Sequence, residues 1–276
     1  MARMTNLYDT SKCSACRGCV IACKDWNQLP GEVRKFSGSY DALEDTNGDT
    51  FTIIKMLEHE DPVDGLSWNF VKYQCMHCFD PACKQVCPAG VYSITEWGAV
   101  VQDLDKCIGC RYCEYGCPFM IPKYRKRVDL STKCTLCNDL VGQEDYRGLP
   151  TMPACARTCP TDALVFGERN ELMRQAEDRA RFLQANGFPR ATIYGKLELG
   201  GLNKIYVLTD TPDKFGLPVD PKVSGTISGW QNWIQPYAAW LIPLALAGSA
   251  ISFVTTRLLA NKYGDHDEAH QEGGHE

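Results

Sequence analysis

The feature that most limits how this chain can fold is its cysteine content. Its 276 residues include 16 Cys, which fall into four sets of four with none left over. The sets are Cys13, Cys16, Cys19 and Cys23; Cys75, Cys78, Cys83 and Cys87; Cys107, Cys110, Cys113 and Cys117; and Cys134, Cys137, Cys155 and Cys159. Cysteine this dense is typical of disulfide scaffolds and metal proteins, not of ordinary enzymes. We therefore expect the fold to be organised around whatever binds these sulfurs.

The spacing within the sets indicates iron-sulfur clusters. The third set reads C-x2-C-x2-C-x3-C and is followed by Pro118, which is the bacterial ferredoxin pattern for a [4Fe-4S] cluster. The first set repeats this spacing without the proline. The second widens one gap to four residues and keeps Pro88, and the fourth separates its pairs by 17 residues and keeps Pro160. The four sets are variants of one unit.

The sets are expected to act in pairs, because in two-cluster ferredoxins the fourth Cys of such a run ligates the other cluster. We pair the first set with the fourth and the second with the third, since this nested order allows one ferredoxin-like module to be inserted in another. The predicted fold class is α+β. Module A comprises residues 1–70 and 131–170, module B comprises residues 71–130, and each is expected to hold two [4Fe-4S] clusters.

Zinc and disulfides are the alternative explanations for the cysteines. Structural zinc also uses C-x2-C pairs, but a third Cys only three residues after the second is not the usual zinc-ribbon pattern. A tight C-x2-C-x2-C run cannot form disulfides among its own members without strain. The spacing therefore favours four iron-sulfur clusters, with iron as the only metal, over a zinc-bound scaffold.

Residues 171–229 are predicted to form a helix, a hairpin and a tether. The segment 170–186 has one apolar helical stripe, with Asn170 as its N-cap and Gly187 just after its end. The stripe consists of Leu172, Ala176, Ala180 and Leu183. Residues 192–197 and 204–209 then suggest a hairpin, and prolines at 212, 218 and 221 suggest a tether.

Residues 230–262 are predicted to form a transmembrane helix, followed by a polar tail at 263–276. No charged residue occurs in the 34 residues from Val223 to Thr256, and about 20 helical residues suffice to cross a hydrocarbon core. A buried helix of a soluble protein is the alternative, but aromatic residues flank the segment as they do at membrane interfaces. These residues are Trp230, Trp233, Tyr237, Trp240 and Tyr263.

Three further patterns carry predictions. Small and hydroxyl side chains recur on one face of the span, and we expect this face to pack on helices of a membrane partner, with a lipid-exposed anchor as the alternative. The face consists of Ala245, Ser249, Ser252 and Thr256.

His77 must lie beside a cluster, where it either donates a hydrogen bond or only packs. The tail histidines His266, His270 and His275 are expected to be solvated.

Several function classes are excluded by what the sequence lacks. A net charge of -5 argues against nucleic acid as a partner. The chain contains no P-loop, no dinucleotide-binding fingerprint and no nucleophile elbow, and no cysteine remains outside the four sets. The pattern therefore predicts an electron carrier without a catalytic residue of its own.

The ordered motifs carry a family likeness. Residues 10–170 resemble the iron-sulfur subunits that partner molybdenum or tungsten oxidoreductases. The motifs that carry this resemblance are the first cysteine set, Cys75-Met76-His77-Cys78, Cys107-Ile108-Gly109-Cys110, Lys133-Cys134-Thr135-Leu136-Cys137 and Cys155-x3-Cys159-Pro160-Thr161. The following region resembles the beta subunit of membrane-bound formate dehydrogenase as far as about residue 260. Its motifs are Ile193-Tyr194-Gly195, Leu199-Gly200-Gly201, Tyr206-Val207-Leu208 and Gly216-Leu217-Pro218.

This resemblance implies the order of the cluster ligands. The cluster nearest the catalytic subunit is expected to use Cys13, Cys16, Cys19 and Cys159, and the next Cys23, Cys134, Cys137 and Cys155. The third is expected to use Cys75, Cys78, Cys83 and Cys117, and the one nearest the membrane Cys87, Cys107, Cys110 and Cys113.

The resemblance also implies the partners. A molybdopterin subunit, with molybdenum or tungsten, oxidises formate, and this chain passes the electrons to a membrane cytochrome b that reduces quinone. The iron-sulfur subunit of a membrane hydrogenase or of another molybdenum reductase is the alternative within the same class. A zinc-binding, membrane-anchored scaffold is the alternative from a different class.

The expected location is the cytoplasmic (inner) membrane, with a single pass. Near the span, Lys222 lies on the N-terminal side, and Arg257 and Lys262 lie on the C-terminal side. The excess of positive charge favours a cytoplasmic C-terminus and a periplasmic cluster body. The first 12 residues contain no apolar stretch that would form a signal peptide, so export alongside a partner with a twin-arginine signal is expected.

Overall fold

A computed structural model describes residues 3–264 except 34, 36, 37, 39, 41, 42, 62–64 and 145–150. Most of the polar tail, including its three histidines, lies outside the described residues. The chain divides into two compact units, Met1–Gly225 and Thr226–Glu276. All 16 cysteines belong to the first unit and lie in the described part.

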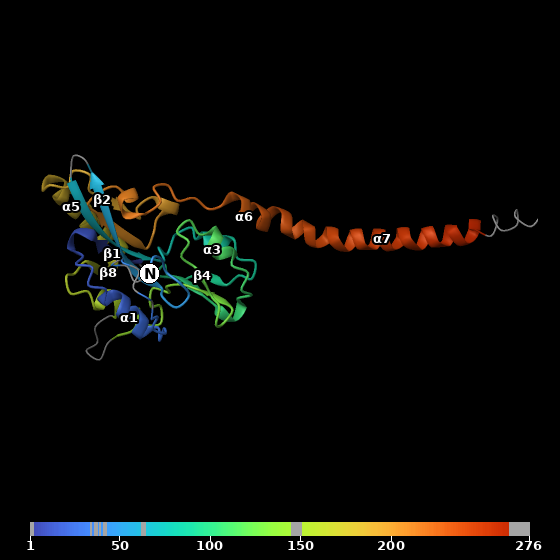
Figure 1. Ribbon diagram of the computed structural model, residues 1–276, viewed down its shortest axis with the longest axis horizontal. Coiled ribbons are helices and arrows are strands. Elements are labelled where there is room, and N and C mark those ends of the chain that lie inside the picture. Colours follow the sequence, from blue (N-terminus) through green and yellow to red (C-terminus); the bar gives the residue numbers. More distant parts are fainter. Residues whose placement is uncertain are drawn as a thin grey trace, which may run out of the picture. The chain divides into compact units, whose positions relative to one another are not determined.

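Most elements before α5 are short helices and strands, and the long helix α7 ends the described chain (Figure 1). The strands are β1 Met4–Asp9, β2 Thr52–Asp61, β3 Gly65–Gln74, β4 Tyr92–Ile94, β5 Val100–Gln102, β6 Lys123–Arg125, β7 Leu130–Thr132, β8 Leu164–Glu168, β9 Thr192–Tyr194 and β10 Lys204–Leu208. The α-helices are α1 Gly18–Trp26, α2 Ala82–Gln85, α3 Tyr112–Gly116, α4 Ala154–Arg157, α5 Arg169–Ala185, α6 Gly225–Gly229 and α7 Gln235–Gly264. The 3-10 helices are Thr10–Lys12, Leu104–Lys106, Glu198–Gly200 and Pro212–Phe215, and Trp230–Ile234 is a π-helix.

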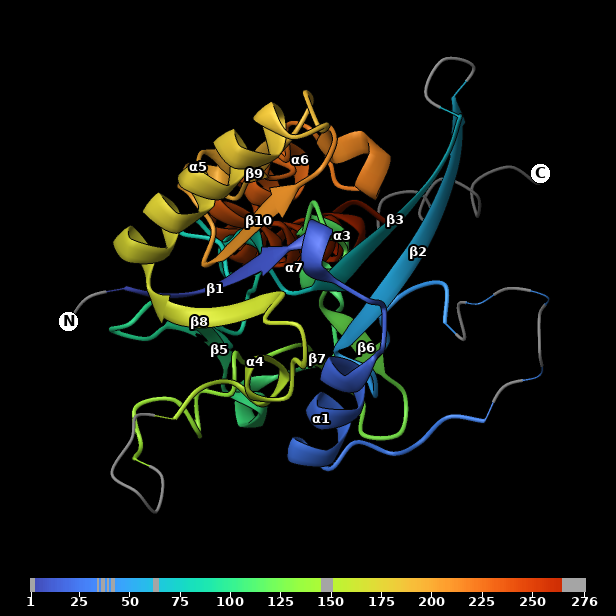
Figure 2. The same ribbon diagram turned by 90° about the vertical axis from the view of Figure 1, so that its left-hand side faces the viewer.

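A mixed four-stranded sheet with the order β8-β1-β10-β9 forms the framework of the first unit. Strand β1 pairs with β10 in parallel and with β8 antiparallel. Alternate residues of β1 and β10 face opposite sides, as the twofold repeat of a strand requires. Leu7, Ile205 and Val207 pack against the apolar stripe of α5, which covers this face of the sheet (Figure 2).

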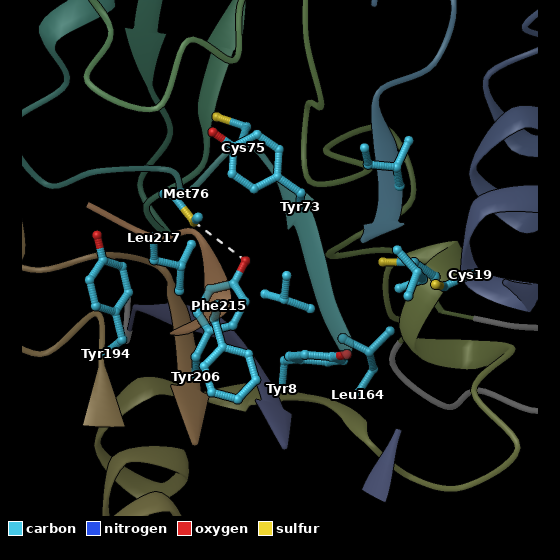
Figure 3. Close-up of a cluster of buried hydrophobic side chains, with 14 of the residues drawn as sticks. Tyr8, Cys19, Tyr73, Cys75, Met76, Leu164, Tyr194, Tyr206, Phe215 and Leu217 are labelled. Carbon is cyan, nitrogen blue, oxygen red and sulfur yellow. Dashed lines mark hydrogen bonds between the residues drawn. The ribbon is translucent and has the colours of Figure 1, made fainter. Parts of the chain in front are cut away.

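The other face of the sheet borders the main core. Tyr8 and Tyr206 contact edge to face, with ring centroids 5.6 Å apart. The hydroxyl oxygen of Tyr206 lies 3.4 Å from the Met76 sulfur, and Figure 3 shows this contact in the cluster that also contains Cys19 and Cys75. The aromatic core therefore packs directly against cysteines of two different sets.

The first unit contains the same order of elements twice, in residues 4–94 and 100–168. Each half begins with a strand, a 3-10 helix and a C-x2-C-x2-C set that leads into a helix. A hairpin follows, then a second cysteine set whose third Cys lies on a short helix, and then a final strand. The halves exchange strands, because β1 pairs with β8 and β4 pairs with β5. Helix α1 packs against α4, and α2 packs against α3. Each of these contacts joins cysteine sets that the sequence analysis pairs.

Helix α5 corrects one prediction from the sequence. The helix and Gly187 beyond its end are confirmed: Gly187 has a φ of +97°, and the Phe188 N–H donates to the Leu183 carbonyl at 3.0 Å. Asn170 is not the N-cap, because the helix already begins at Arg169 with Glu168 as its cap. The Arg169 N–H donates to the Arg3 carbonyl at 2.8 Å. This backbone partner satisfies the first helical donor and makes a side-chain cap unnecessary.

The predicted hairpin at residues 192–209 is confirmed in the antiparallel pair β9 and β10, with Tyr194 opposite Tyr206. Strand β9 ends one residue before Gly195, which has a φ of +102°. A Cβ atom at this position would lie 2.3 Å from the Lys204 carbonyl oxygen, so only glycine fits.

Helix α7 occupies most of the second unit. It follows the π-helix and runs through Pro243 to Gly264. Within the described part of the chain, its segment from Gln235 to Ala260 is the one helical stretch long and apolar enough to cross a membrane. Its apolar side chains, such as Leu244 and Phe253, are exposed among the described residues of this unit, so the helix has a large apolar surface there.

Candidate metal centres

The 16 cysteines line four pockets, each with about 290 to 340 Å³ of space. Pocket 1 is lined by Cys13, Cys16, Cys19 and Cys159, and pocket 2 by Cys23, Cys134, Cys137 and Cys155. Pocket 3 is lined by Cys75, Cys78, Cys83 and Cys117, and pocket 4 by Cys87, Cys107, Cys110 and Cys113. Each pocket thus combines three cysteines of one set with one cysteine of another.

The backbone has the same conformation before the second Cys of every set. The residues there are Ala15, His77, Gly109 and Leu136, and all have φ between +48° and +68°. This left-handed turn bends the chain back over the first sulfur, so that the N–H of Ala15 lies 3.4 Å from the Cys13 sulfur. The N–H of Leu136 lies 3.4 Å from the Cys134 sulfur in the same way. Backbone donors therefore point at the ligand atoms.

A helix presents the third Cys of each set, in two alternating forms. In the first and third sets the helix follows a left-handed arginine, Arg17 or Arg111. In the second and fourth sets it follows a proline, Pro81 or Pro153. Each pair of packed helices therefore contains one helix of each form.

The fourth Cys ends its helix wherever proline follows. Helices α2, α3 and α4 are four or five residues long and are each followed by a Cys-Pro step. Helix α1 lacks this proline and continues for nine residues to Trp26. Proline has no N–H to donate and disfavours helical conformation in the residue before it, so these three helices end before the fourth Cys, whereas Cys23 lies within α1 and still lines the pocket of another set.

Burial opposes the ionisation of several thiols. It raises the pKa of Cys117 to about 11 and of Cys137 to about 12, with neighbouring thiolates adding to the rise. Only Cys16 and Cys110 are exposed. Because metal ligands must be thiolates, a bound group has to bring enough positive charge to displace these protons.

The shape of the pockets fits a polynuclear cluster better than a single ion. Zinc needs its sulfur ligands at about 2.3 Å from one point. Within the described residues, no three His, Cys, Asp or Glu side chains converge closely enough to share one ion. Four thiols arranged around a wider space are what a cubane with iron at alternate corners requires, so the residues fit a [4Fe-4S] cluster.

Pocket 2 also has two lysines in its lining that the sequence analysis missed. Lys72 and Lys204 are both almost completely buried, with 0% and 2% of their surface exposed. The Lys204 ammonium has no hydrogen-bond partner in the described structure. A buried ammonium needs a counter-charge, and four thiolates around a metal cluster would supply one.

His77 lies in a buried environment. Its Nδ1 accepts a hydrogen bond from the Val100 N–H at 3.0 Å, so the neutral ring has its proton on Nε2. Burial lowers the pKa of His77 well below its usual value, and the nearby Lys133 and Lys204 lower it further. The ring is not in the lining of any of the four described pockets. The Nε2 atom is buried without a hydrogen-bond partner in the described structure, so donation to a cluster and simple packing both stay predictions.

The four pockets neighbour one another in a row. Burial raises the pKa of Cys19, Cys134 and Cys83, a buried lysine opposes the rise in each case, and a thiol of an adjacent pocket adds to it. The adjacent partners are Cys155 for Cys19, Cys75 for Cys134 and Cys113 for Cys83. These electrostatic influences between neighbouring thiols indicate the order pocket 1, pocket 2, pocket 3, pocket 4.

Two asparagines beside pocket 2 were also missed. Asn6 Nδ2 lies 3.8 Å from the Cys155 sulfur, and Asn27 Nδ2 lies 3.6 Å from the Cys23 sulfur. Asn6 lies outside the cysteine sets, so the sequence gives no signal that it is near a ligand. Asn27 follows Cys23 by one helical turn, which does place it near that cysteine. A search of the helix face after each set would have found Asn27 alone.

Comparison with known proteins identifies the family. Residues 66–169 match the family model of a 4Fe-4S dicluster domain. The chain is 38% identical over 273 residues to the nitrate-inducible formate dehydrogenase iron-sulfur subunit of Escherichia coli K12, covering 97% of this chain and 89% of that protein. It is 35% identical to the formate dehydrogenase-O iron-sulfur subunit of the same strain, covering 91% and 83%.

A hydrogenase-associated protein is also similar. The chain is 32% identical over 295 residues to the hydrogenase-2 operon protein HybA of Escherichia coli O157:H7, covering 96% of this chain and 88% of that protein. The identity is greater to the formate dehydrogenase subunits, which are electron-transfer and not catalytic subunits. The chain belongs to the family of formate dehydrogenase iron-sulfur subunits.

Proposed function

We propose that each of the four pockets holds one [4Fe-4S] cluster, bound by the four cysteines that line it. Modules A and B, with residues 1–70 plus 131–170 and 71–130, would each hold two. The observation that supports this proposal is the grouping of all 16 cysteines into four pockets of four. The repeated left-handed turn before the second Cys gives each pocket a similar backbone.

Electrons enter at pocket 1 and leave at pocket 4. Both end pockets have one exposed cysteine, Cys16 or Cys110, whereas the cysteines of pocket 2 are all buried. Exposed apolar side chains flank these cysteines, with Ile21 near pocket 1 and Ile108 at pocket 4. Such surfaces suit partner subunits, which must bring their own redox groups close to the terminal clusters. Helices α1 and α3, which carry these two ends, lie in different parts of the body (Figure 1).

The partner at pocket 1 is a formate-oxidising subunit with a molybdopterin cofactor of molybdenum or tungsten. The partner at pocket 4 is a membrane cytochrome b, which passes the electrons to quinone. Helix α7 anchors the chain in the cytoplasmic membrane, and the cluster body lies on the periplasmic side. The similarity to named formate dehydrogenase subunits supports the first partner, and the apolar segment from Gln235 to Ala260 supports the membrane anchor.

A hydrogenase electron-transfer subunit is the second candidate, supported by the similarity to the HybA protein. Both candidates require the same four pockets, so the distinction depends on the catalytic partner. A zinc-binding scaffold would share only the cysteines and the span.

The test is to purify the complex anaerobically and identify its large subunit. Addition of formate should bleach the broad visible absorbance and produce the electron paramagnetic resonance signals of reduced clusters, whereas hydrogen gas should not. Reduction by hydrogen with no response to formate would contradict the proposed function and favour the second candidate. Absence of visible absorbance, with zinc as the bound metal, would exclude both.

A further inference from the structure

Pocket 2 differs from the other three pockets in its positive charge. Lys72 projects from β3 and Lys204 from β10, and both line this pocket. Pocket 3 is lined by one lysine, Lys133. Pockets 1 and 4 are each lined by one half-buried arginine, Arg17 and Arg111, next to an exposed cysteine where solvent screens charge. Among the four described pockets, pocket 2 is therefore the one that is lined by two buried cations.

Neither lysine of pocket 2 is neutralised by a carboxylate. The Lys72 ammonium donates to the Thr52 hydroxyl and, over 2.6 Å, to the Gln74 side-chain oxygen, and both acceptors are neutral. Lys204 has no hydrogen-bond partner, and neither lysine forms an ion pair within the described residues. The ionisable groups that act on them with negative charge are cysteines, mainly Cys155 and Cys134 of pocket 2, and for Lys72 also Cys19 of the neighbouring pocket 1. Burial opposes the charge of both lysines: at Lys72 the surrounding thiolates, Cys155 first, outweigh it and raise the pKa, whereas at Lys204 burial prevails and lowers the pKa.

The topology explains why both side chains point into the pocket. Lys204 and Asn6 are register partners in the parallel pair of β10 and β1, on the face that carries Tyr206. The Tyr206 hydroxyl donates to the Lys72 carbonyl at 2.9 Å and so ties β3 to this face. The two ammonium groups are thus positioned by the packed sheet and not by a flexible loop.

We propose that Lys72 and Lys204 raise the reduction potential of the cluster in pocket 2 above that of the other three clusters. This inference rests on the proposed function, in which pocket 2 holds a [4Fe-4S] cluster. Reduction adds one electron, and therefore one negative charge, to the site, with no bond made or broken. Fixed positive charges in a low-dielectric interior stabilise that added charge. Burial alone has the opposite effect, but pocket 3 is also largely buried and has one cation fewer.

The consequence for function is that pocket 2 retains an electron longest. Each electron reaches it from pocket 1 and leaves toward pocket 3, so a higher potential at the second position stores one reducing equivalent inside the body. Formate oxidation releases two electrons whereas each cluster accepts one, and a storage position beside the entry cluster separates the two transfers.

The experiment is a potentiometric titration of the complete complex followed by electron paramagnetic resonance. Lys72→Met and Lys204→Met should each shift the same midpoint, the highest of the four, to a more negative potential. Cys155→Ser should alter or abolish that same signal, which assigns it to pocket 2. Lys196→Met is the matched control, because Lys196 is half exposed, pairs with Glu177 and lines none of the described pockets. It should leave all four midpoints unchanged.

The variants Lys72→Arg and Lys204→Arg keep the charge and should keep the midpoint near its original value. If a Met variant loses the cluster, the corresponding Arg variant tests the proposal instead. An Arg variant with full iron and the original potential supports the proposal, and one with a lowered potential or lost iron overturns it. Unchanged midpoints in iron-replete Met variants also overturn it. If Cys155→Ser leaves all four signals intact, the ligand assignment itself fails, and with it the proposed function of pocket 2.

Discussion

At the scale of single residues, the left-handed turn before the second Cys is the most repeated feature of the molecule. Ala15, His77 and Leu136 adopt it although they are not glycine, and each such residue costs about 1 to 2 kcal/mol. Strained residues persist where surrounding structure determines them, commonly at functional sites. We infer that cluster ligation offsets this cost at all three positions.

The cysteines were predictable from the sequence, whereas the lysines of pocket 2 were not. Spacing alone identifies C-x2-C-x2-C runs, because their geometry is local. Lys72 lies in a strand where a polar residue is usually exposed, and its burial arises only when β3 packs against a sheet that includes β10 from far along the chain. The position of Lys204 depends on the same long-range packing.

Crossed ligation gives a prediction at this scale. Cys87→Ala should remove the cluster of Cys107, Cys110 and Cys113, because Cys87 lines their pocket and not that of its own set. About 12 of 16 iron atoms should remain by the ligand count. Cys117→Ala, the matched variant, should instead remove the cluster of Cys75, Cys78 and Cys83.

Iron analysis and electron paramagnetic resonance spectra distinguish the two variants. If each substitution damaged the cluster of its own sequence set, the pocket assignment would be wrong.

At the scale of elements, sequence patterns located the regular ones and failed at irregular ends. The stripe from Leu172 to Leu183 is buried as a helical period of 3.6 requires. Asn170 was misassigned as the cap because the helix start depends on a tertiary contact. The Arg169 N–H donates to the Arg3 carbonyl, and no local sequence pattern reveals this bond. The hairpin of β2 and β3 has ten residues in each strand, beyond the short apolar run that marks its start in the sequence.

Removal of iron should unfold module B before the four-stranded sheet. Its strands have three residues and its helices four or five, and elements this short are not stable in isolation. After treatment with a chelator under reducing conditions, hydrogen exchange should become fast between residues 75 and 134.

Helix α5 serves as the internal control, because Leu172, Ala176 and Leu183 pack on the sheet without contact to any pocket. It should remain protected longer. Equal protection of module B before and after iron removal would contradict a structural role for the clusters.

The small face of α7 gives a second prediction for an element. Ser249 and Thr256 donate to carbonyls of their own helix, at 2.8 Å in both cases, so their hydroxyls need no external partner and the face can pack closely on another helix. Ser249→Leu combined with Ser252→Leu should release the membrane partner while the chain stays in the membrane. Val254→Leu, on the opposite side of the helix, should not.

Co-purification of the cytochrome measures this effect. Unchanged co-purification in the double variant would favour an anchor that faces only lipid.

At the scale of the whole molecule, two copies of one pattern have exchanged strands. The sequence indicated the pairing of the cysteine sets through their nested order, and the contacts of α1 with α4 and α2 with α3 agree with it. The strand exchange between β1 and β8 was not predictable, because β-pairing over 150 residues leaves no local signal. Together with the pairing of β4 and β5, that exchange joins the two halves of the repeated pattern.

Orientation in the membrane gives a prediction for the whole chain. Arg257 and Lys262 after the span outnumber Lys222 before it, and positive flanks favour the cytoplasm. Protease added to spheroplasts should therefore degrade the cluster body and spare residues beyond Arg257. A protected body with a cleaved tail would reverse the orientation.

The central claim is that four pockets hold four [4Fe-4S] clusters, and the metal content of the purified complex tests it most directly. Anaerobic protein, quantified per copy of this chain after subtraction of any iron that the partner subunits hold, should contain about 16 iron and about 16 sulfide. The expected spectra are those of cubane clusters, and zinc should be absent at stoichiometric amounts. About four zinc with little iron, or iron for only two clusters in fully assembled complex, would contradict the account.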